Sequence, residues 1–424
     1  MVKLVIIADD LTGALDTGVQ FAKCAVPTLI TTKVDMEFGK LDDTIQVVVV
    51  DTESRHLSGK CASKLVKQVV IYAKSCGVDY FYKKTDSTLR GNIGAELVAV
   101  MNSCGSNEIM FIPAFPKTGR TTMGGQQYVN GISLDKTAFA KDPLNPIKSG
   151  SLAGIIKDQC EVEVKIISKN ERPDFFQSST ALSETVYVFD AQVDQDLMNI
   201  GNMLKEENKL KVTAGCAGFA EILLKLITFS KTSLVKPSYH RNTLVVCGSV
   251  NDLSIEQIKE AEKNSTMSLL LTPEVLLKKD YINTQEGRQL IQQIVKCIKS
   301  GNPLILKTID QKEDIPDYIE YGMKNGLTKE LVHLNIAKNL GMLIKEILCD
   351  IEVGNLVVFG GDIALEIIEA LDVQGVIAME EMLPGIAVSH FHWAQSSMRF
   401  ITKAGGFGEK DVLNKILVDL KGRG

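Results

Sequence analysis

The residues with the clearest chemical potential are two acidic residues near the start of the chain. Asp9 and Asp10 directly follow the apolar run "KLVIIA" in the segment "IIADDLTGALDTG". Carboxylates at the end of a buried strand can bind Mg²⁺, accept a proton from a substrate or hydrogen-bond a polyol. The alternative is structural, because Asp also caps helices and Thr12-Gly13 opens a predicted helix. The sequence leaves both roles open for this pair.

A second chemical cluster lies in "YKKTDSTLRGNIGAEL", residues 82–97, where an apolar stretch passes into a predicted helix. Gly91 and Gly94 allow close approach to the backbone, and Asn92 is expected to cap the helix. Helix N-termini attract anions, so this segment is a candidate seat for a small carboxylate or a phosphoryl group. A capped turn with solvated charges is the alternative. The candidate side chains are those of Lys83, Lys84, Asp86, Ser87, Thr88 and Arg90.

One arginine and three glycine turns complete the set of candidates. Arg55 in "DTESRHL" follows the run "IQVVVV" and can clamp a carboxylate or phosphate, although a lone Arg is more often part of a surface ion pair. In the second half, "CGSVNDLS" (247–254), "FGGDIALEII" (359–368) and "KAGGFGEKD" (403–411) place glycines directly after apolar runs. Backbone N–H groups in such turns can surround phosphates. Three of them together favour nucleotide binding over ordinary tight turns.

The elements that position these residues alternate between apolar strands and amphipathic helices. In the first half, "KLVIIA", "IQVVVVDT", "YFYKKT" and "EIMFIPAF" are typical of buried strands. In the second half, "TLVVCG", "NPLILKT", "NLVVFGG" and "MRFITKAGG" repeat the pattern, and Ser254 with Gln257 predicts a capping box for one of the helices. This order predicts an α/β fold with mainly parallel sheets, which bind ligands at the carboxyl ends of their strands.

The length of 424 residues predicts two such domains. Residues 229–241 contain Lys, Ser, Thr and Pro in the manner of a linker, so we predict domains at residues 1–235 and 236–424. Residues 113–150 interrupt the first domain with Pro, Gly and polar clusters, and Asn130-Gly131 between two short alternating runs predicts a hairpin turn. We expect this excursion to act as a lid or binding loop.

Composition excludes several classes of protein. A net charge of -5 argues against a general nucleic-acid or anionic-membrane binder, and no run approaches the roughly 18 apolar residues of a membrane span. The nine cysteines include no C-x-x-C pair, which favours reduced thiols over a zinc or redox site. The apolar run at the N-terminus is too short for a secretory signal, and we expect a cytoplasmic protein.

Several catalytic motifs are also missing from the sequence. The lack of G-x-x-x-x-G-K-[ST] excludes the usual P-loop, and the lack of G-x-G-x-x-G with a following acidic residue gives little support to a dinucleotide-dependent dehydrogenase. His390 and His392 in "SHFHW" alternate on one face of a predicted strand, where packing is a better explanation than metal binding.

At these residues the sequence resembles the four-carbon acid sugar kinase family. The motifs "ADDLTGA", "KKTDSTLRGNIGAEL", "PAFPKTGRTT", "YVNG", "DPLNP", "GGD" and "KAGGFG" occur in order along essentially the whole chain. The resemblance implies ATP-dependent phosphorylation of the terminal hydroxyl of a four-carbon sugar acid, with D-threonate or D-erythronate favoured over a 3-oxo-tetronate. It also implies an N-terminal domain that holds the acid, a C-terminal domain that holds ATP, and Mg²⁺ as cofactor.

Carried over by motif, the resemblance implies two sets of site residues. The substrate residues are Asp9, Asp10, Arg55, Lys84, Thr85, Asp86 and Ser87, and the nucleotide residues are Ser249, Gly360, Gly361, Asp362 and Gly405. The family's last motif usually reads K-S-G-N-F-G, whereas this chain has Ala404 and Gly406 at two of those positions. Side-chain contacts to the nucleotide are therefore in doubt there, and backbone contacts are not.

A mechanism follows from both lines of reasoning. Phosphoryl transfer depends on positioning and charge neutralisation, so Mg²⁺, Lys84 and backbone N–H groups are expected to stabilise the transferring group. Either Asp10 or Asp86 then accepts the hydroxyl proton. The rival functions are a nicotinamide-dependent sugar-acid dehydrogenase and a non-catalytic sugar-acid sensor. The metal ligands cannot be assigned from the sequence, and a homodimer is left open as the assembly.

Overall fold

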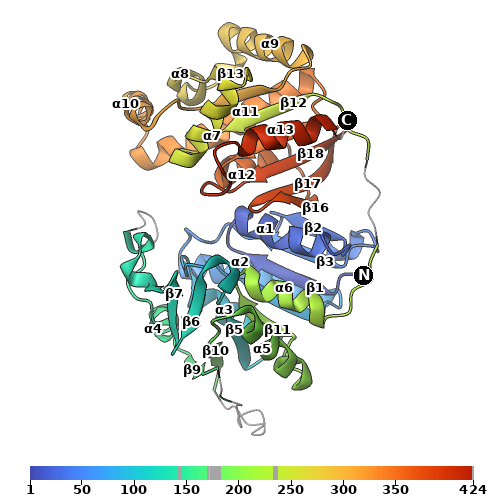
Figure 1. Cartoon of the computed structure of the whole chain (residues 1–424), viewed down its shortest axis with the longest axis vertical. Helices are drawn as coiled ribbons and strands as arrows, with labels where there is room; N and C mark the ends of the chain where they lie inside the picture. Colours follow the sequence, from blue (N-terminus) through green and yellow to red (C-terminus); the bar gives the residue numbers. More distant parts are fainter. Residues whose placement is uncertain (142–145, 170, 172–182, 233–236, 423–424) are drawn as a thin grey trace. The chain divides into compact units, whose positions relative to one another are not determined.

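Two compact units make up the chain, Met1–Leu234 and Val235–Gly424. The computed structural model describes residues 1–141, 146–169, 171, 183–232 and 237–422 (Figure 1). The predicted domain boundary at 235–236 and most of the "DPLNP" segment lie outside the described residues. Each unit is built on its own run of hydrogen-bonded strands flanked by helices, which confirms the predicted α/β fold class with mainly parallel sheets.

In the first unit, the described residues form neighbouring strands in the order β2-β3-β1-β4-β11-β5-β10-β9, and the pairings between them are parallel. Helices α1, α6 and α5 pack beside one another, and α2, α3 and α4 form a second group. The strands are β1 (Leu4–Ala8), β2 (Thr28–Thr31), β3 (Val47–Asp51), β4 (Tyr80–Lys84), β5 (Glu108–Ile112), β9 (Glu163–Ile167), β10 (Thr185–Phe189) and β11 (Val212–Gly215). The helices are α1 (Leu11–Ala22), α2 (Gly59–Ser75), α3 (Ile93–Cys104), α4 (Leu152–Lys157), α5 (Asp194–Glu206) and α6 (Ala217–Leu226).

Parallel pairing explains the apolar character of these strands. Both faces of a parallel sheet are covered by helices, so its strands are continuous apolar runs without alternation. All five residues of β1 and of β3 are buried, as are those of β10. The sequence did not single out β2 or β11 as strands, and β11 is a short strand of four residues that ends in Gly215.

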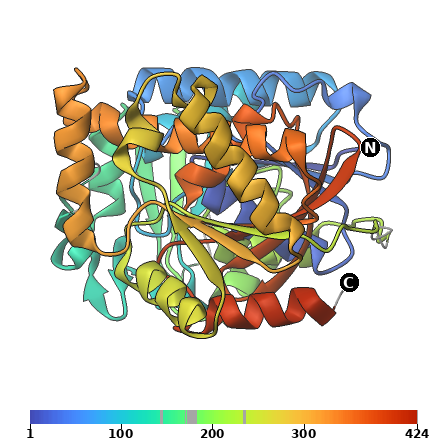
Figure 2. The ribbon, with the colours of Figure 1, turned by 90° about the horizontal axis from the view of Figure 1, so that it is seen from above.

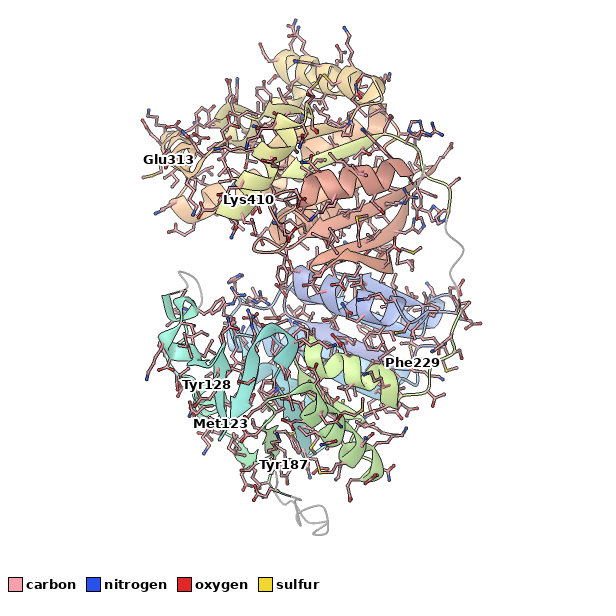
Figure 3. All side chains as sticks on the ribbon, in the orientation of Figure 1. Met123, Tyr128, Tyr187, Phe229, Glu313 and Lys410 are labelled. Atoms are coloured by element: carbon pink, nitrogen blue, oxygen red, sulfur yellow. The ribbon has the colours of Figure 1, made fainter. Side chains whose placement is uncertain are left out.

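The excursion after β5 forms a small antiparallel sheet of β6 (Arg120–Met123), β7 (Gln126–Val129) and β8 (Ile132–Ser133). Asn130 and Gly131 join β7 to β8 with φ angles of 51° and 77°, and Val129 pairs with Ile132, which confirms the predicted hairpin. Met123 and Tyr128 mark this sheet in Figure 3.

The second unit has the strand order β13-β14-β12-β15-β18-β17-β16. Pairings from β13 to β18 are parallel, whereas β16, β17 and β18 pair antiparallel. Helices α7 and α13 lie side by side (Figure 2), and α11 packs against α8, α9, α10 and α12. The strands are β12 (Thr243–Cys247), β13 (Met267–Leu270), β14 (Leu304–Lys307), β15 (Asn355–Phe359), β16 (Val376–Leu383), β17 (Ile386–Trp393) and β18 (Ser396–Lys403). The helices are α7 (Asp252–Lys263), α8 (Pro273–Leu277), α9 (Gln285–Lys299), α10 (Ile315–Lys324), α11 (Lys329–Asp350), α12 (Gly361–Ala370) and α13 (Val412–Gly422).

None of the helices in the described residues is long and apolar enough to cross a membrane.

Candidate functional site

The candidate residues of the first unit meet at the carboxyl ends of three neighbouring strands. Asp9 and Asp10 follow β1, Arg55 lies in the loop after β3, and Lys84 is the last residue of β4. Because β1 pairs in parallel with both β3 and β4, these three strand ends share one edge of the sheet. Residues that are up to 75 positions apart in the chain are thus brought to one place.

Arg55 is the centre of this cluster. Its Nε and Nη2 atoms donate to Asp9 Oδ2 and Oδ1 at 2.8 and 3.0 Å, and its Nη1 atom donates to Asp10 Oδ2 at 2.7 Å. The guanidinium group is one-tenth exposed and the Asp9 carboxylate is almost fully buried. These bonds use three of the five N–H donors of the guanidinium group, and the other two donate to no group among the described residues, which leaves them for a ligand.

Asp10 has the structural role that the sequence left open, and it also contacts Arg55. It is the N-cap of α1, and its Oδ1 atom accepts from the backbone N–H of Gly13 at 3.0 Å. Its other oxygen faces Arg55. Burial raises the pKa of Asp10 above its ordinary value even though Arg55 opposes the shift.

Gly13 makes room for two charged groups at the start of α1. A Cβ atom at this position would lie 2.6 Å from Asp10 Oδ1 and 2.9 Å from Lys84 Nζ. Both distances are shorter than van der Waals contact, so a side chain at Gly13 would displace the capping carboxylate or the ammonium group. The glycine in "DDLTGA" therefore allows Lys84 to approach the N-terminus of the helix.

Asp86 is in a different electrostatic environment from Asp10. Its Oδ2 atom accepts from Thr88 Oγ1, from the backbone N–H of Arg90 and from Arg90 Nε at 2.7 Å. Burial disfavours the charged form of Asp86, but Arg55 and Arg90 outweigh burial and hold the pKa of its carboxyl well below the usual range. Asp86 is therefore a poor proton acceptor, and Arg90, which the sequence could not assign, is its ion-pair partner.

Lys84, Thr85 and Ser87 line the exit of β4. Lys84 is buried, its Nζ atom donates to the carbonyl of Thr85 at 3.0 Å, and within the described part of the chain it has no acidic ion-pair partner. The Thr85 hydroxyl is buried and lacks a hydrogen-bond partner among the described residues. The carbonyl of Ser87 accepts from Gln127 Nε2 at 3.2 Å, which connects this turn to the small sheet.

Beneath the cluster lies a buried ion pair that the sequence did not predict. Lys83 Nζ is 3.0 Å from Glu96 Oε2, and both side chains are at most 1% exposed. Lys83 also donates to the carbonyl of Ile7, and Ser54 Oγ donates to Glu96. The only sequence signal for this pair is an acidic residue on the apolar face of the helix that follows the second cluster.

The expected side-chain cap by Asn92 is not formed. Asn92 occupies the N-cap position of α3, but its side chain accepts no hydrogen bond there. Its Nδ2 atom instead donates to the carbonyls of Ser54 and Leu57 at 2.8 and 2.9 Å. The side chain thus holds the loop that carries Arg55 through two of its backbone carbonyl groups.

In the second unit the three glycine turns converge on Ser249. The turns follow β12, β15 and β18, which are consecutive in the sheet. A Cβ atom on Gly360 would lie 3.7 Å from Ser249 N, and one on Gly405 would lie 3.8 Å from Ser249 Oγ. Gly360 has φ = 117° and precedes Gly361, the first residue of α12, so the turn requires glycine. The N-termini of α7 and α12 therefore open beside Ser249, an arrangement that favours anions.

The predicted capping box at Ser254 and Gln257 is wrong. Helix α7 starts at Asp252, and Asn251 caps it by accepting from Leu253 N at 3.0 Å. Ser254 Oγ donates to the carbonyl of Gly405 at 3.2 Å. The Nε2 atom of Gln257 donates to the carbonyls of Phe407 and Glu409 at 3.1 and 2.9 Å. Both side chains therefore hold the 403–411 turn from inside α7.

The remaining candidates of this unit have local partners. The carboxylate of Asp362 is exposed in the first turn of α12, and its Oδ2 atom lies 3.0 Å from His333 Nε2. His390 and His392 contact each other on β17, with 3.2 Å between their Nε2 atoms. Within the described residues no three His, Cys, Asp or Glu side chains are grouped so as to hold a metal ion.

Comparisons with known proteins cover both units. A model described as a sugar-binding N-terminal domain matches residues 4–223, and one described as a nucleotide-binding C-terminal domain matches residues 244–413. The chain is 29% identical over 419 residues to a D-threonate kinase of Salmonella typhimurium, covering 97% of this chain and 96% of that protein. It is 28% identical over 428 residues to a D-erythronate kinase of Heliobacterium modesticaldum, covering 97% and 95%.

The fold also matches a solved structure. A protein of Salmonella typhimurium LT2 superposes with a TM-score of 0.79 at 19% identity, covering 98% of this chain and 99% of that chain. At this identity the likeness shows the fold alone.

Proposed function

Because the chain belongs to the four-carbon acid sugar kinase family, we propose that it uses ATP to phosphorylate the terminal hydroxyl of D-threonate or D-erythronate. Relatives that match over nearly the whole chain include kinases of these two acids at 25–29% identity and 3-oxo-tetronate kinases at 22–23% identity. The two rival functions, a dehydrogenase and a sensor, are disfavoured because the relatives are named kinases.

The observation that carries the proposal is the cluster of Asp9, Asp10, Arg55 and Lys84 at one sheet edge. Two carboxylates and two cations balance one another formally, and Lys84 lacks an acidic partner within the described part of the chain. A sugar acid brings one carboxylate and several hydroxyls. Lys84 and the two remaining N–H donors of Arg55 would bind the carboxylate, and Asp9 and Asp10 would accept from hydroxyls.

Asp10 is the better general base of the two candidates. A base must reach the substrate proton and must bind it more readily than a strongly ion-paired carboxylate does. The pKa of Asp10 is raised by burial, whereas that of Asp86 is lowered by two arginines against the effect of burial. When Asp10 takes the proton, the formal charge of the cluster changes from zero to +1, which favours the incoming phosphoryl group.

The nucleotide is assigned to the second unit. Its phosphates would be bound by Ser249 and by the backbone N–H groups of the turns at Gly360, Gly361 and Gly405. The proposal also places Asp362, at the start of α12, among the residues near the nucleotide. Its carboxylate contacts His333.

The described residues do not form a protein-built cage for Mg²⁺. Asp9 and Asp10 are already paired with Arg55, and Asp362 is paired with His333. Mg²⁺ in kinases is commonly held by one or two carboxylates together with the nucleotide phosphates, and there it neutralises phosphate charge. We therefore propose that Mg²⁺ is bound mainly by the nucleotide phosphates. We attribute no catalytic step to a metal site formed by the protein alone.

The proposal is tested by ADP release with purified protein, ATP and a panel of acids. The panel contains both enantiomers of threonate and of erythronate, and the 3-oxo acids. We expect turnover with D-threonate or D-erythronate. A 3-oxo acid as the preferred substrate would overturn the substrate assignment, and no ADP release with any member would overturn the kinase assignment.

Asp10→Asn tests the base. The Asn carbonyl oxygen can still accept from Gly13 N, so the helix cap is kept while the proton acceptor is lost. We expect kcat to fall at least about 100-fold, the usual scale for loss of a general base. Asp42→Asn is the control, because the Asp42 side chain is exposed and, within the described residues, accepts hydrogen bonds only from Thr44. Unchanged kcat in Asp10→Asn would eliminate Asp10 as the base.

A further inference from the structure

A buried lysine lies directly under the glycine turn of the second unit. Lys403 is the last residue of β18 and is 2% exposed. Its Nζ atom donates to the carbonyl of Gly405 at 2.9 Å and to Ser254 Oγ at 3.1 Å. It also lies 5.0 Å from the centre of the Phe359 ring. All of these partners are neutral, so the ammonium group is buried without a counter-ion in the described part of the chain.

Two other buried lysines, Lys83 and Lys307, have acidic partners, whereas Lys84 shares the lack of one within the described residues and lies at the proposed substrate site. Lys307 ends β14 in the same sheet, is 7% exposed, and pairs with Glu262 and with Asp310 at 2.5 Å. Burial of a charge without a partner is costly, which is why buried charges are normally paired. Lys403 differs from Lys307 in this respect, although both residues end parallel strands on the same edge of the sheet.

The groups that face Lys403 confirm its isolation. From β12 the titratable neighbour is Cys247, and burial raises the pKa of its thiol to about 11, so the thiol is neutral at pH 8. Helix α7 contributes the neutral side chain of Ser254, β15 contributes Phe359, and the turn contributes a carbonyl group. Burial lowers the pKa of Lys403 itself to about 8.

We propose that Lys403 positions the 403–408 turn and that nucleotide phosphates supply its missing counter-charge, so that nucleotide binding is coupled to proton uptake by Lys403. The inference rests on the proposed function, because it places phosphates at Ser249, Gly360 and Gly405. The carbonyl that Lys403 holds belongs to Gly405 itself. A negative charge at this turn favours the ammonium form over the neutral amine.

The coupling has a defined direction. In the free protein the ammonium form of Lys403 is lost as the pH rises through about 8. In the complex the phosphates hold the proton to a higher pH, so binding takes up a proton in the window above about 8 and nucleotide affinity falls there as the pH rises. Below pH 7 the lysine is charged in both states and no uptake is expected from it.

The experiment is calorimetric titration of the whole protein with MgADP at pH 8.5. The phosphates of the nucleotide are already ionised at this pH, and the titration is repeated in two buffers with different ionisation enthalpies, Tris and bicine. We expect an uptake of about half a proton or more per ADP bound. ADP binding with no dependence of the heat on the buffer would overturn the inference. No ADP binding at all would overturn the proposed function instead.

Two variants assign the proton to a residue. Lys403→Met should lose the proton uptake and bind ADP at least about tenfold more weakly at pH 7. Lys307→Met is the matched control, since it removes a lysine from the same edge of the sheet and should keep the uptake. Uptake that persists in Lys403→Met, or that disappears in Lys307→Met, would refute the assignment. The wild-type titration decides the coupling even if Lys403→Met does not fold.

Discussion

Removal of Lys83 tests whether the buried ion pair under the cluster of Asp9, Asp10, Arg55 and Lys84 stabilises the first unit. Lys83 and Glu96 are 0% and 1% exposed, with 3.0 Å between Nζ and Oε2. Lys83→Met keeps most of the side-chain volume but leaves the Glu96 carboxylate buried with Ser54 as its remaining hydrogen-bond donor. Loss of one partner of a buried pair costs about 3–5 kcal/mol, so we expect the free energy of unfolding to fall by that amount at pH 8.

The penalty should depend on pH in a predictable direction. Burial raises the pKa of Glu96 above its ordinary value even though Lys83 opposes the shift, so loss of Lys83 raises it further. A carboxyl with a raised pKa in the folded state loses stability as the pH rises from its unfolded value to its folded value, by about 1.4 kcal/mol per pH unit. The penalty of Lys83→Met should therefore shrink as the pH falls, because protonation removes the buried charge of Glu96.

The assay is urea unfolding followed by far-UV circular dichroism at pH 5 and pH 8, with hydrogen exchange of the α3 peptides to locate the effect. Fluorescence of the single tryptophan does not serve, because Trp393 lies in β17 of the second unit. Lys211→Met is the control, since it breaks an exposed pair with Asp79 and should cost less than about 1 kcal/mol. Equal stability of Lys83→Met and wild type, or a penalty that is the same at both pH values, would refute the reasoning.

Two further variants test the positioning of the substrate residues. Gly13→Ala should raise the KM for the sugar acid about tenfold, because its Cβ would lie 2.6 Å from Asp10 Oδ1 and 2.9 Å from Lys84 Nζ. An unchanged KM with an intact fold would show that neither group binds the acid in the proposed position. Gln127→Leu removes the donor to the Ser87 carbonyl and should cost about 1 kcal/mol of acid binding. In steady-state kinetics the KM for the acid should rise and the KM for ATP should not, and a change in both would contradict a role confined to the turn.

Much of the fold could be predicted from the sequence because parallel sheets have a strong signature. Strands buried on both faces appear as continuous apolar runs, and the helices between them have their own periodicity. The same regularity predicted that Asp9, Arg55 and Lys84 lie close together, because the carboxyl ends of adjacent parallel strands lie at one edge of the sheet. The hairpin at Asn130-Gly131 was predictable since only a few residue types adopt its backbone angles.

The pairing of charged side chains could not be predicted in the same way. Lys83 and Lys84 are adjacent and identical in type, yet one is paired with Glu96 in the core and the other lies at the candidate site. Successive residues of a strand point to opposite faces of the sheet, and the sequence does not show which face packs against the acidic side chain of Glu96. Arg90 likewise pairs with Asp86 only because the turn between them folds back.

The predicted capping box at Ser254 was wrong for a related reason. A hydroxyl followed three residues later by Gln fits a capping box, but Asn251 caps the helix. Ser254 and Gln257 are buried and bond to backbone carbonyls about 150 positions later in the chain. A local rule cannot detect partners at that separation.

These buried contacts also bear on the departure from the family motif at Ala404 and Gly406. The turn is held from within the unit by Lys403, Ser254 and Gln257, which all bond to backbone carbonyls. A Cβ atom on Gly406 would meet nothing within 4 Å, so the turn does not need glycine there for space. Its shape therefore does not depend on the side chains at 404 and 406. Under the proposed function, loss of the hydroxyl and the amide would remove side-chain donors to the nucleotide, and phosphate binding would rest on Ser249, the backbone N–H groups and the charge of Lys403.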